Sequence, residues 1–490
     1  MTAKKNIIQK EQMLSVVLTL LYISLHVFIA IHHEAWRDEG QSWMLVKNST
    51  VTELLSDLCV EGHPALWFFT IMPFIKLGLP FRFFSLISLI FMGLSYYCLL
   101  RFSPFPFGIR VLLSFSSLFI YYNPVIPRIY SEATLLVIVV SIIFPKRSDH
   151  PWLYGILLVL LAQSHILLEG LTIGLVFECF ITLISKKSRK SEAAIPFILG
   201  TISGLAAIVE LYPRAGTNRS VDISASGIFS NFTIERFFRL RDATTFSLWG
   251  FQGSFPSLVL TIFLLLSIVS ISYLAIRYCE ISMFIEWSLI VLLSFGIPLF
   301  IVFFVYSIHS QMATIFLLLL LGFLLILWGS CDSNTLKYIA LVFVLLLSLS
   351  TIPHVLKAAV YDIGEPYSNS KATADFFVQN APEDSVILVA ENEYNSPVYG
   401  YVSDMRPDIE FYSFQKLEPY KYHLWGISYP QFTSAEIASI AVNQFSGKTV
   451  YLLLPISTYE IEDSSWLEGL LLENGNNPSQ EDYVVYRVNV

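Results

Sequence analysis

Apolar runs of about 20 residues recur along most of this chain, and no other feature constrains its fold as strongly. The first run is Met13–Ile31. Ten further runs lie at roughly 83–100, 108–122, 133–144, 152–168, 170–185, 193–211, 255–276, 282–305, 311–329 and 336–353. Only 14% of the 490 residues are charged, against about 25% in soluble domains. The sequence therefore predicts a polytopic α-helical membrane protein.

The positive-inside rule predicts how this chain is oriented. Lys4, Lys5 and Lys10 precede the first run, and no small-residue cleavage site follows it, so we interpret it as a retained helix with a cytoplasmic N-terminus rather than a signal peptide. The segment Ala65–Gly78 is short and contains Pro73 and Lys76. If it lies at the interface, the basic loops at 101, 146–147, 186–190, 277 and 337 all fall inside. About 11 spanning helices plus an interfacial helix are therefore expected.

With this orientation, the polar segments at helix ends gather on the outer side. They are Glu34–His63, Asn123–Glu132, His165–Glu169, Tyr212–Ser254, Tyr306–Gln311 and the C-terminal region. A transporter usually places such groups near the midplane on repeated halves, and the sequence shows no internal repeat. Glu178 is the main exception, and we interpret it as a helix-packing residue.

The C-terminal region, 354–490, is predicted to be a separate extracytoplasmic α/β domain, after a membrane module at 1–353. Helix-like stretches at 370–380, 434–445 and 466–473 alternate with apolar strands at 385–391, 449–454 and 483–488. From 354 onward, about 19 acidic residues outnumber 7 basic ones, and this acidic balance argues against a nucleic-acid partner. The five cysteines are scattered and form no disulfide framework.

The first outer loop holds the strongest candidates for chemistry, because acids beside a bilayer are costly without a polar cavity or ligand. Asp38-Glu39 and Glu61-x-His63 lie about 20 residues apart. Their carboxylates suit either a divalent cation such as Mg²⁺ or Mn²⁺, held by Asp38 and Glu61, or a general base. The alternative is that Arg37 simply pairs with these acids in a solvated loop.

Residues near other helix ends extend this candidate site. His63-Pro64 begins the interfacial helix, whose free N–H groups suit a phosphate. Arg128, with Tyr130 two residues on, suits a lipid phosphate, although interfacial snorkelling is equally compatible. Additional site-lining residues are His165, Glu169 and His309, each of which is otherwise a packed, hydrogen-bonded polar group.

The order of these motifs resembles one known group of membrane enzymes. A hydrophobic helix is followed by Asp38-Glu39, then by His63-Pro64-Ala65-Leu66-Trp67, then by Arg128-x-Tyr130. This resembles the GT-C membrane glycosyltransferases, in particular the protein O-mannosyltransferases and the lipid A aminoarabinose transferase. The similarity covers roughly residues 10–200 in motif terms. Ala65 departs from the group's usual double proline, and no WWD motif of the oligosaccharyltransferase kind is present.

The resemblance implies a role for each matched residue. Asp38 takes the position of the catalytic acid of the first outer loop, with Glu39 beside it, and Glu61 and His63 flank the donor phosphate. Arg128 matches a basic residue near the second outer loop. The implied reaction transfers a sugar from a polyprenyl-phosphate donor, with inversion, and the metal requirement varies within the group.

The sequence thus predicts a multi-pass plasma-membrane glycosyltransferase acting on the extracytoplasmic face. Its partners would be membrane lipid, a polyprenyl-phosphate-linked sugar, and a glycan, protein or lipid acceptor. A flippase or transporter of lipid-linked glycans is the first alternative, and a non-catalytic membrane scaffold is the second. The sugar, the acceptor and any metal are left open.

Overall fold

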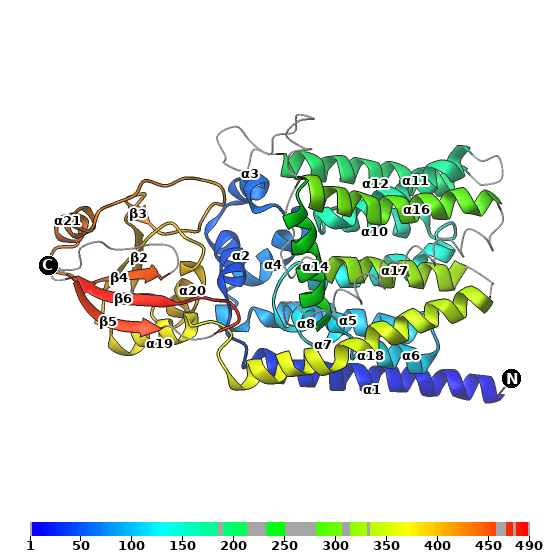
Figure 1. Ribbon diagram of the computed structural model, residues 1–490, viewed down its shortest axis with the longest axis horizontal. Helices are drawn as coiled ribbons and strands as arrows, with labels where there is room; N and C mark the ends of the chain where they lie inside the picture. Colours follow the sequence, from blue (N-terminus) through cyan, green and yellow to red (C-terminus); the bar gives the residue numbers. More distant parts are fainter. Residues whose placement is uncertain are drawn as a thin grey trace.

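A computed structural model describes residues 2–184, 190–212, 232–249, 281–305, 314–330, 334–456, 467–473 and 477–488. A bundle of helices occupies one end of the long axis and a small α/β layer the other (Figure 1). The N-terminus lies at the end of the bundle away from the sheet. The long helices of the bundle are α1 (Thr2–Ala30), α5 (Ser85–Phe102), α9 (Tyr130–Ile143), α10 (Pro151–Ala162), α11 (Glu169–Ile184), α12 (Lys190–Leu211), α16 (Ile281–Phe300), α17 (Thr314–Ser330) and α18 (Asn334–Gly364).

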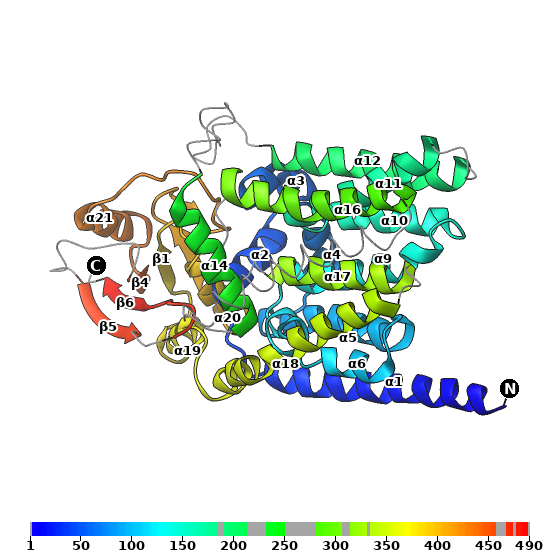
Figure 2. The same ribbon diagram turned by 45° about the vertical axis from the view of Figure 1, so that its right-hand side comes forward.

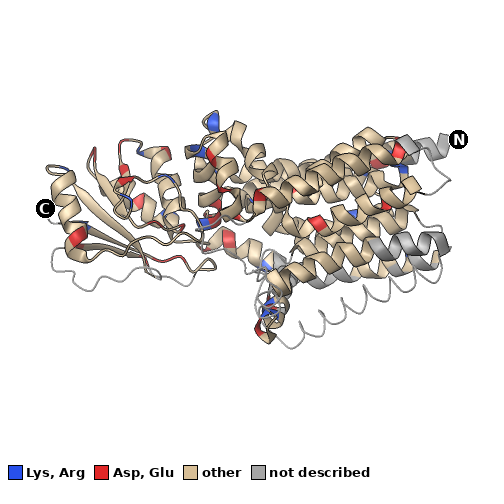
Figure 3. Cartoon of the chain, turned by 90° about the horizontal axis from the view of Figure 1, so that it is seen from above, with Lys and Arg blue, Asp and Glu red and all other residues tan. Residues whose placement is uncertain are grey.

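The apolar composition of these helices fits a bilayer. Within the described residues, four stretches are long and apolar enough to cross a membrane, namely Ile8–Ala30, Phe81–Phe102, Ile166–Ile184 and Glu192–Leu211. Charged side chains gather in the α/β layer and at its junction with the bundle, which itself carries few (Figure 3). A helix-rich membrane protein is therefore confirmed. The count of about 11 spans is not confirmed, and the run at 255–276 lies outside the described residues.

One predicted span is broken into short helices. The run at 108–122 forms α6 (Phe107–Leu113), α7 (Ser117–Ile120) and α8 (Tyr122–Val125) instead of one continuous helix. Ser114 and Ser116 lie between α6 and α7, and their hydroxyls donate to backbone carbonyls three residues back, at 2.6 and 2.7 Å. Such local bonds compete with helix propagation, and Ser116 is extended. The prediction of one continuous span at 108–122 was therefore wrong.

The first outer loop is mostly helical. It forms α2 (Arg37–Asn48) and α3 (Val51–Glu61), followed by α4 (Leu66–Lys76), whose interfacial position stays a prediction. Thr50 and Glu53 form a capping box at the start of α3, and Gly62 ends α3 with a left-handed φ of 78°. Helix α14 (Ile234–Trp249) lies crosswise at the end of the bundle nearest the sheet (Figures 1 and 2). Short 3₁₀ or π turns lie at Phe81–Phe83, Phe144–Lys146, Ile166–Leu168 and Ile301–Val305.

The C-terminal layer contains one six-stranded sheet in the order β3-β2-β1-β4-β6-β5. Strand β1 pairs in parallel with β2 and β4, and the outer pairs are antiparallel. Ile387 and Val389 face one core cluster with Phe377, whereas Val386 and Leu388 face another with Ile437, as the twofold period of a strand dictates. The elements are α19 (Ser370–Asn380), β1 (Val386–Val389), α20 (Asn395–Met405), β2 (Glu410–Ser413), β3 (Glu418–Pro419), α21 (Ser434–Gln444), β4 (Val450–Pro455), β5 (Leu467–Glu473) and β6 (Tyr483–Val488).

Most elements expected in this region are confirmed. The helices at 370–380 and 434–445 and the three apolar strands appear within two residues of their expected bounds. The stretch 466–473 is wrong as a helix, because its described part is the strand β5, which pairs along its length with β6. Helix α20 and strands β2 and β3 were missed. Helix α18 runs unbroken through the expected boundary at 353–354, and the division into two domains stays a prediction.

Candidate functional site

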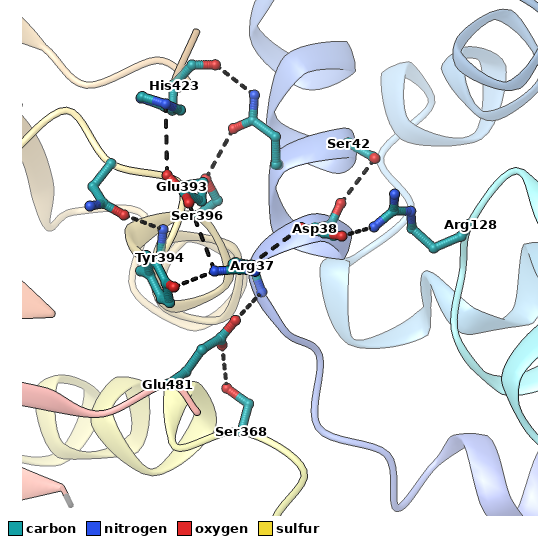
Figure 4. Close-up of polar contacts among 12 residues, drawn as sticks. Arg37, Asp38, Ser42, Arg128, Ser368, Glu393, Tyr394, Ser396, His423 and Glu481 are labelled. Carbon is teal, nitrogen blue, oxygen red and sulfur yellow. Dashed lines mark hydrogen bonds and ion pairs between the residues drawn. The ribbon is translucent and has the colours of Figure 1, made fainter. Parts of the chain in front are cut away.

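Five charged or titratable side chains form a continuous row at the junction of the bundle and the sheet. Arg128 Nη1 bonds Asp38 Oδ2, and Arg37 Nε lies 3.6 Å from Asp38 Oδ1. Arg37 Nη1 lies 3.9 Å from Glu393 Oε1, and His423 Nε2 lies 3.7 Å from Glu393 Oε2. We call these residues the charged row (Figure 4). Asp38 is second in this row, beside Arg128, which precedes α9, and Arg37 joins it to the two residues of the C-terminal layer.

The C-terminal layer caps the helix that carries Asp38. Trp36, at the N-cap position of α2, provides no side-chain cap. Instead, Glu481 Oε1 accepts a 2.7 Å hydrogen bond from the backbone N–H of Arg37, and the Ser368 hydroxyl donates to Glu481 Oε2 at 2.7 Å. Burial raises the pKa of Glu481 to about 8, partly offset by these two bonds. The first turn of α2 is thus ordered from a position 444 residues away in sequence.

The Arg128 end of the row carries a permanent positive charge. Burial alone would lower the pKa of Arg128, but the facing Asp38 carboxylate outweighs it and raises that pKa above its ordinary value. The Arg128 side chain is 12% exposed and that of Asp38 is 23% exposed. Both groups are therefore partly shielded from water but still reachable, as a site for ligands requires.

Two histidines and a tyrosine continue from Arg128 into the bundle. The Arg128 guanidinium carbon lies 5.9 Å from the Tyr130 ring centroid. The His165 ring lies 5.7 Å from the Tyr130 ring and 5.2 Å from the His63 ring, between centroids. The structure thus brings together Asp38, His63, Arg128, Tyr130 and His165, which the sequence places in three different segments.

The tautomer of His165 follows from its contacts. His165 is fully buried, and its Nδ1 accepts a hydrogen bond from the backbone N–H of Leu167 at 3.1 Å. Burial, and then the charge of Arg128, lowers the pKa of His165 to about 3, so the ring is neutral. The proton therefore belongs to Nε2, which has no hydrogen-bond partner among the described residues. A buried N–H donor of this kind calls for an acceptor oxygen.

Glu39 lies apart from Asp38, in a separate buried network. His33 Nε2 contacts Glu39 Oε1 and His33 Nδ1 contacts Asp362 Oδ2, both at 2.9 Å, and all three side chains are at most 1% exposed. Burial alone would lower the pKa of His33, but the two carboxylates raise it well above its ordinary value. The network joins the end of α1, the first turn of α2 and the end of α18. A catalytic role for Glu39 stays a prediction.

The other candidate residues have varied surroundings. Glu61 Oε1 accepts from Gln41 Nε2 at 3.0 Å, and the same amide donates to the His423 carbonyl at 2.6 Å. Glu169 is buried, and its Oε1 has no hydrogen-bond partner among the described residues. Glu178 bonds the Arg147 guanidinium, which fits the packing role expected for it. His309 lies outside the described residues.

The start of the interfacial helix is less open to a phosphate than the sequence suggested. The backbone N–H of Ala65 donates to Glu210 Oε2 at 3.3 Å, and that of Leu66 donates to the Gln163 carbonyl at 3.2 Å. These two N–H groups at the start of α4 are therefore already engaged. Arg128 and His165 are the better candidates for binding an anion.

A divalent cation does not fit the residues suggested for it. Asp38 is bonded to Arg128, and Glu61 is bonded to Gln41. In the part of the chain that the structure describes, no group of three or more His, Cys, Asp or Glu residues is arranged to hold a metal ion. A carboxylate bonded to a guanidinium is a poor metal ligand.

Several residues of the site were missed from the sequence. Glu393, His423 and Glu481 reach α2 from more than 350 residues away, and His33 and Asp362 meet across 329 residues. No local pattern marks these pairings. The aromatic-rich segment Tyr420–Thr433, which contains His423, was the one available signal, because long structureless loops are frequently functional.

Comparison with known proteins finds a structural resemblance only. No protein-family model matches the chain, and no curated protein matches it. Among solved structures, the crystal structure of ArnT from Cupriavidus metallidurans in the apo state is similar at a TM-score of 0.41 and 12% sequence identity. The match covers 100% of this chain and 99% of that chain.

Proposed function

We propose that this protein is an integral membrane glycosyltransferase. It transfers a sugar from a polyprenyl-phosphate donor to an acceptor on the extracytoplasmic face, with inversion at the anomeric carbon. The observation that carries the proposal is the position of Asp38 in the charged row, between a cationic, membrane-side end and a C-terminal layer outside the bundle. Group transfer requires a base that lies between the donor site and the acceptor site.

The donor phosphate binds at the Arg128 end. Arg128 supplies a fixed charge and two N–H donors suited to phosphate oxygens. The Nε2–H of His165 supplies a further buried donor that has no partner among the described residues. His63 and Tyr130 form the ring walls around this end. These donors stabilise the negative charge that develops on the leaving polyprenyl phosphate.

Asp38 acts as the general base for the acceptor. Its carboxylate takes the proton of the acceptor hydroxyl, the acceptor oxygen forms a bond to the anomeric carbon, and the bond from that carbon to the phosphate oxygen breaks. The bonding electrons leave with the polyprenyl phosphate. Because attack and departure occur on opposite faces, the configuration inverts. Binding of the donor phosphate to Arg128 draws this guanidinium from Asp38 and leaves the carboxylate available as a base.

Glu39 and Glu61 do not contact the reacting atoms and instead position the residues of the site. Glu39 is sealed in the network with His33 and Asp362 and fixes the first turn of α2, so we assign it as a positioning residue. Glu61 holds Gln41, which in turn holds the loop carrying His423. Glu169, which is buried, lines the inner side of the donor site.

The proposed orientation places the N-terminus in the cytoplasm and the C-terminal layer outside a plasma membrane. The lysines near the start of α1, Lys4, Lys5 and Lys10, favour the cytoplasm under the positive-inside rule. The N-terminus and the sheet lie at opposite ends of the long axis, as this orientation needs (Figure 1). The donor site then lies at the outer end of the bundle, where a lipid-linked sugar can enter from the bilayer.

The test measures release of polyprenyl phosphate in proteoliposomes. The native chain and Asp38→Asn are supplied with a panel of polyprenyl-phosphate sugars and a cell-envelope extract as acceptor. We expect release by the native chain and a loss of at least about 100-fold in Asp38→Asn, as for removal of a general base. Asp375→Asn, which alters an exposed pair with Lys371, is the matched control. Equal release by native chain and Asp38→Asn would remove Asp38 from catalysis, and sugar movement without release would favour a transporter.

A further inference from the structure

We infer that the surface formed by Glu393, His423, Trp425 and Tyr429 binds the acceptor, and that this acceptor is a saccharide. We call these four residues the acceptor surface. The inference rests on the proposed function and deepens it, because it names the class of molecule that brings its hydroxyl to Asp38.

The sheet topology places this surface where α/β layers commonly bind ligands. From β1 the chain passes through α20 to β2 on one side, whereas β4 lies on the other side of β1. The carboxyl ends of β1 and β4 therefore border a topological switch point, the usual ligand crevice of such sheets. Glu391 and Glu393 lie two and four residues after the end of β1. Beside them at the start of α20, Asn395 is fully buried, and its Oδ1 has no hydrogen-bond partner among the described residues.

A long aromatic segment covers this edge of the sheet. Residues 420–433 connect β3 to α21 without forming a helix or strand. The segment is nevertheless fixed at both sides. Tyr420 OH donates to the Asn392 carbonyl at 2.7 Å, and Gln415 Nε2 donates to the Pro430 carbonyl at 2.6 Å. Long ordered loops of this kind are usually functional. A prearranged loop loses little conformational entropy when a ligand binds.

The same segment is also bonded to the helices of the first outer loop. Gln41 of α2 donates to the His423 carbonyl at 2.6 Å, and Asn48 Nδ2 donates to the Lys421 carbonyl at 2.7 Å. Tyr422 OH donates to Asp57 Oδ2 of α3 at 3.0 Å. The acceptor surface is therefore held in a fixed position relative to the helix that carries Asp38.

The side chains of the surface suit sugar rings and their hydroxyl groups. The His423 ring contacts the Trp425 ring at 5.4 Å and the Tyr429 ring at 5.9 Å, between centroids, and Trp425 and Tyr429 are half-buried. Aromatic faces pack against the C–H faces of sugars, and carboxylates accept bonds from their hydroxyls. Beneath the acceptor surface, the Glu391 carboxylate is buried and pairs with Lys416 at 3.0 Å.

Position along the charged row links this surface to the reaction. His423 and Glu393 form the end of the row opposite Arg128, and Arg37 bridges Glu393 to Asp38. Tyr394 OH bonds the same guanidinium and holds it in place. A saccharide on the surface thus lies on the far side of Asp38 from the donor phosphate. This is the side from which an inverting attack must come.

The test compares acceptor kinetics of the full-length chain in proteoliposomes. We expect Trp425→Ala to raise the KM for a saccharide acceptor by about tenfold or more, as for loss of an aromatic anchor. The KM for the polyprenyl-phosphate sugar and the slow hydrolysis of that donor without acceptor should stay within about twofold. Val442→Ala, an exposed change on α21 of the same layer, should leave every parameter unchanged. An unchanged acceptor KM in Trp425→Ala would overturn the inference.

A binding measurement separates this inference from the proposed function. N-acetylglucosamine oligomers, maltotriose and a Ser/Thr-containing peptide are titrated into the full-length chain, with calorimetry as the readout. Saturable binding of a saccharide, lost in Trp425→Ala and retained in Val442→Ala, supports the surface even where no donor is turned over. Binding of the peptide alone, or equal saccharide binding by both variants, would contradict it. Failure of all donors in the presence of saccharide binding would count against the proposed function alone.

Discussion

At the scale of single residues, Asp38 and Glu39 show how neighbours in sequence acquire different roles. Asp38 faces Arg128 and is partly exposed, whereas Glu39 faces His33 and is fully buried. In a helix, adjacent side chains point about 100° apart, so one turn directs them to different surroundings. The pair Asp-Glu in the sequence indicates a site but cannot say which carboxylate reaches the substrate.

Arg128 gives a sharp prediction at this scale. Arg128→Gln removes the charge that faces the donor phosphate, so we expect the donor KM to rise and kcat/KM to fall about 10²–10³-fold. Donor titrations of sugar transfer measure both values. Arg82→Gln makes the same chemical change at an exposed arginine outside the charged row and should stay near native values. A donor KM that is unchanged in Arg128→Gln would place the phosphate elsewhere.

Five of the predicted site residues lie together in the structure, and one local rule indicated each of them from the sequence. Asp38, His63, Arg128, Tyr130 and His165 all occur at helix ends on the predicted outer side, where ionisable groups need a ligand or partner. Glu393, His423 and Glu481 follow no such rule. Their roles depend on how the sheet docks against α2, a tertiary contact that leaves no pattern in the local sequence.

At the scale of elements, α2 depends on residues outside itself. It begins without a side-chain cap of its own, and Glu481 supplies the missing acceptor from the C-terminal layer. A cap of this kind contributes about 1 kcal/mol to a helix. The stretch 466–473, predicted as a helix, shows the converse case. Its apolar residues fit the period of a helix and that of a strand, and pairing with β6 makes its described part a strand.

The raised pKa of Glu481 predicts how stability depends on pH. The pKa is about 8 in the folded chain and about 4.3 for an ordinary glutamate, so folding favours the protonated form. The folded chain therefore keeps a proton that the unfolded chain loses, and stability falls as pH rises from about 4.3 to about 8. We expect the thermal midpoint of the detergent-solubilised chain to fall less steeply across this window in Glu481→Gln. Parallel pH profiles of the native chain and the variant would contradict this assignment.

At the scale of the whole molecule, the site exists only where the bundle and the C-terminal layer meet. The charged row takes Arg128 and Asp38 from the first and Glu393 and His423 from the second. The sequence predicts both parts from their patterns, apolar runs for one and alternating strands and helices for the other. It does not predict their interface, because packing of α2 against α20 depends on shape rather than on periodicity.

Gly40 provides the test of this interface. A Cβ at Gly40 would lie 2.4 Å from the backbone nitrogen of Pro397 in α20, a contact that only movement of one helix can relieve. Overpacking of this kind costs about 1–3 kcal/mol. We expect Gly40→Ala to lower sugar transfer at least about tenfold and to speed proteolytic cleavage between bundle and sheet. Gly108→Ala, whose Cβ would meet nothing within 4 Å, is the matched control. Native transfer by Gly40→Ala would mean that Asp38 works without the docked layer, and that the acceptor is held by the bundle instead.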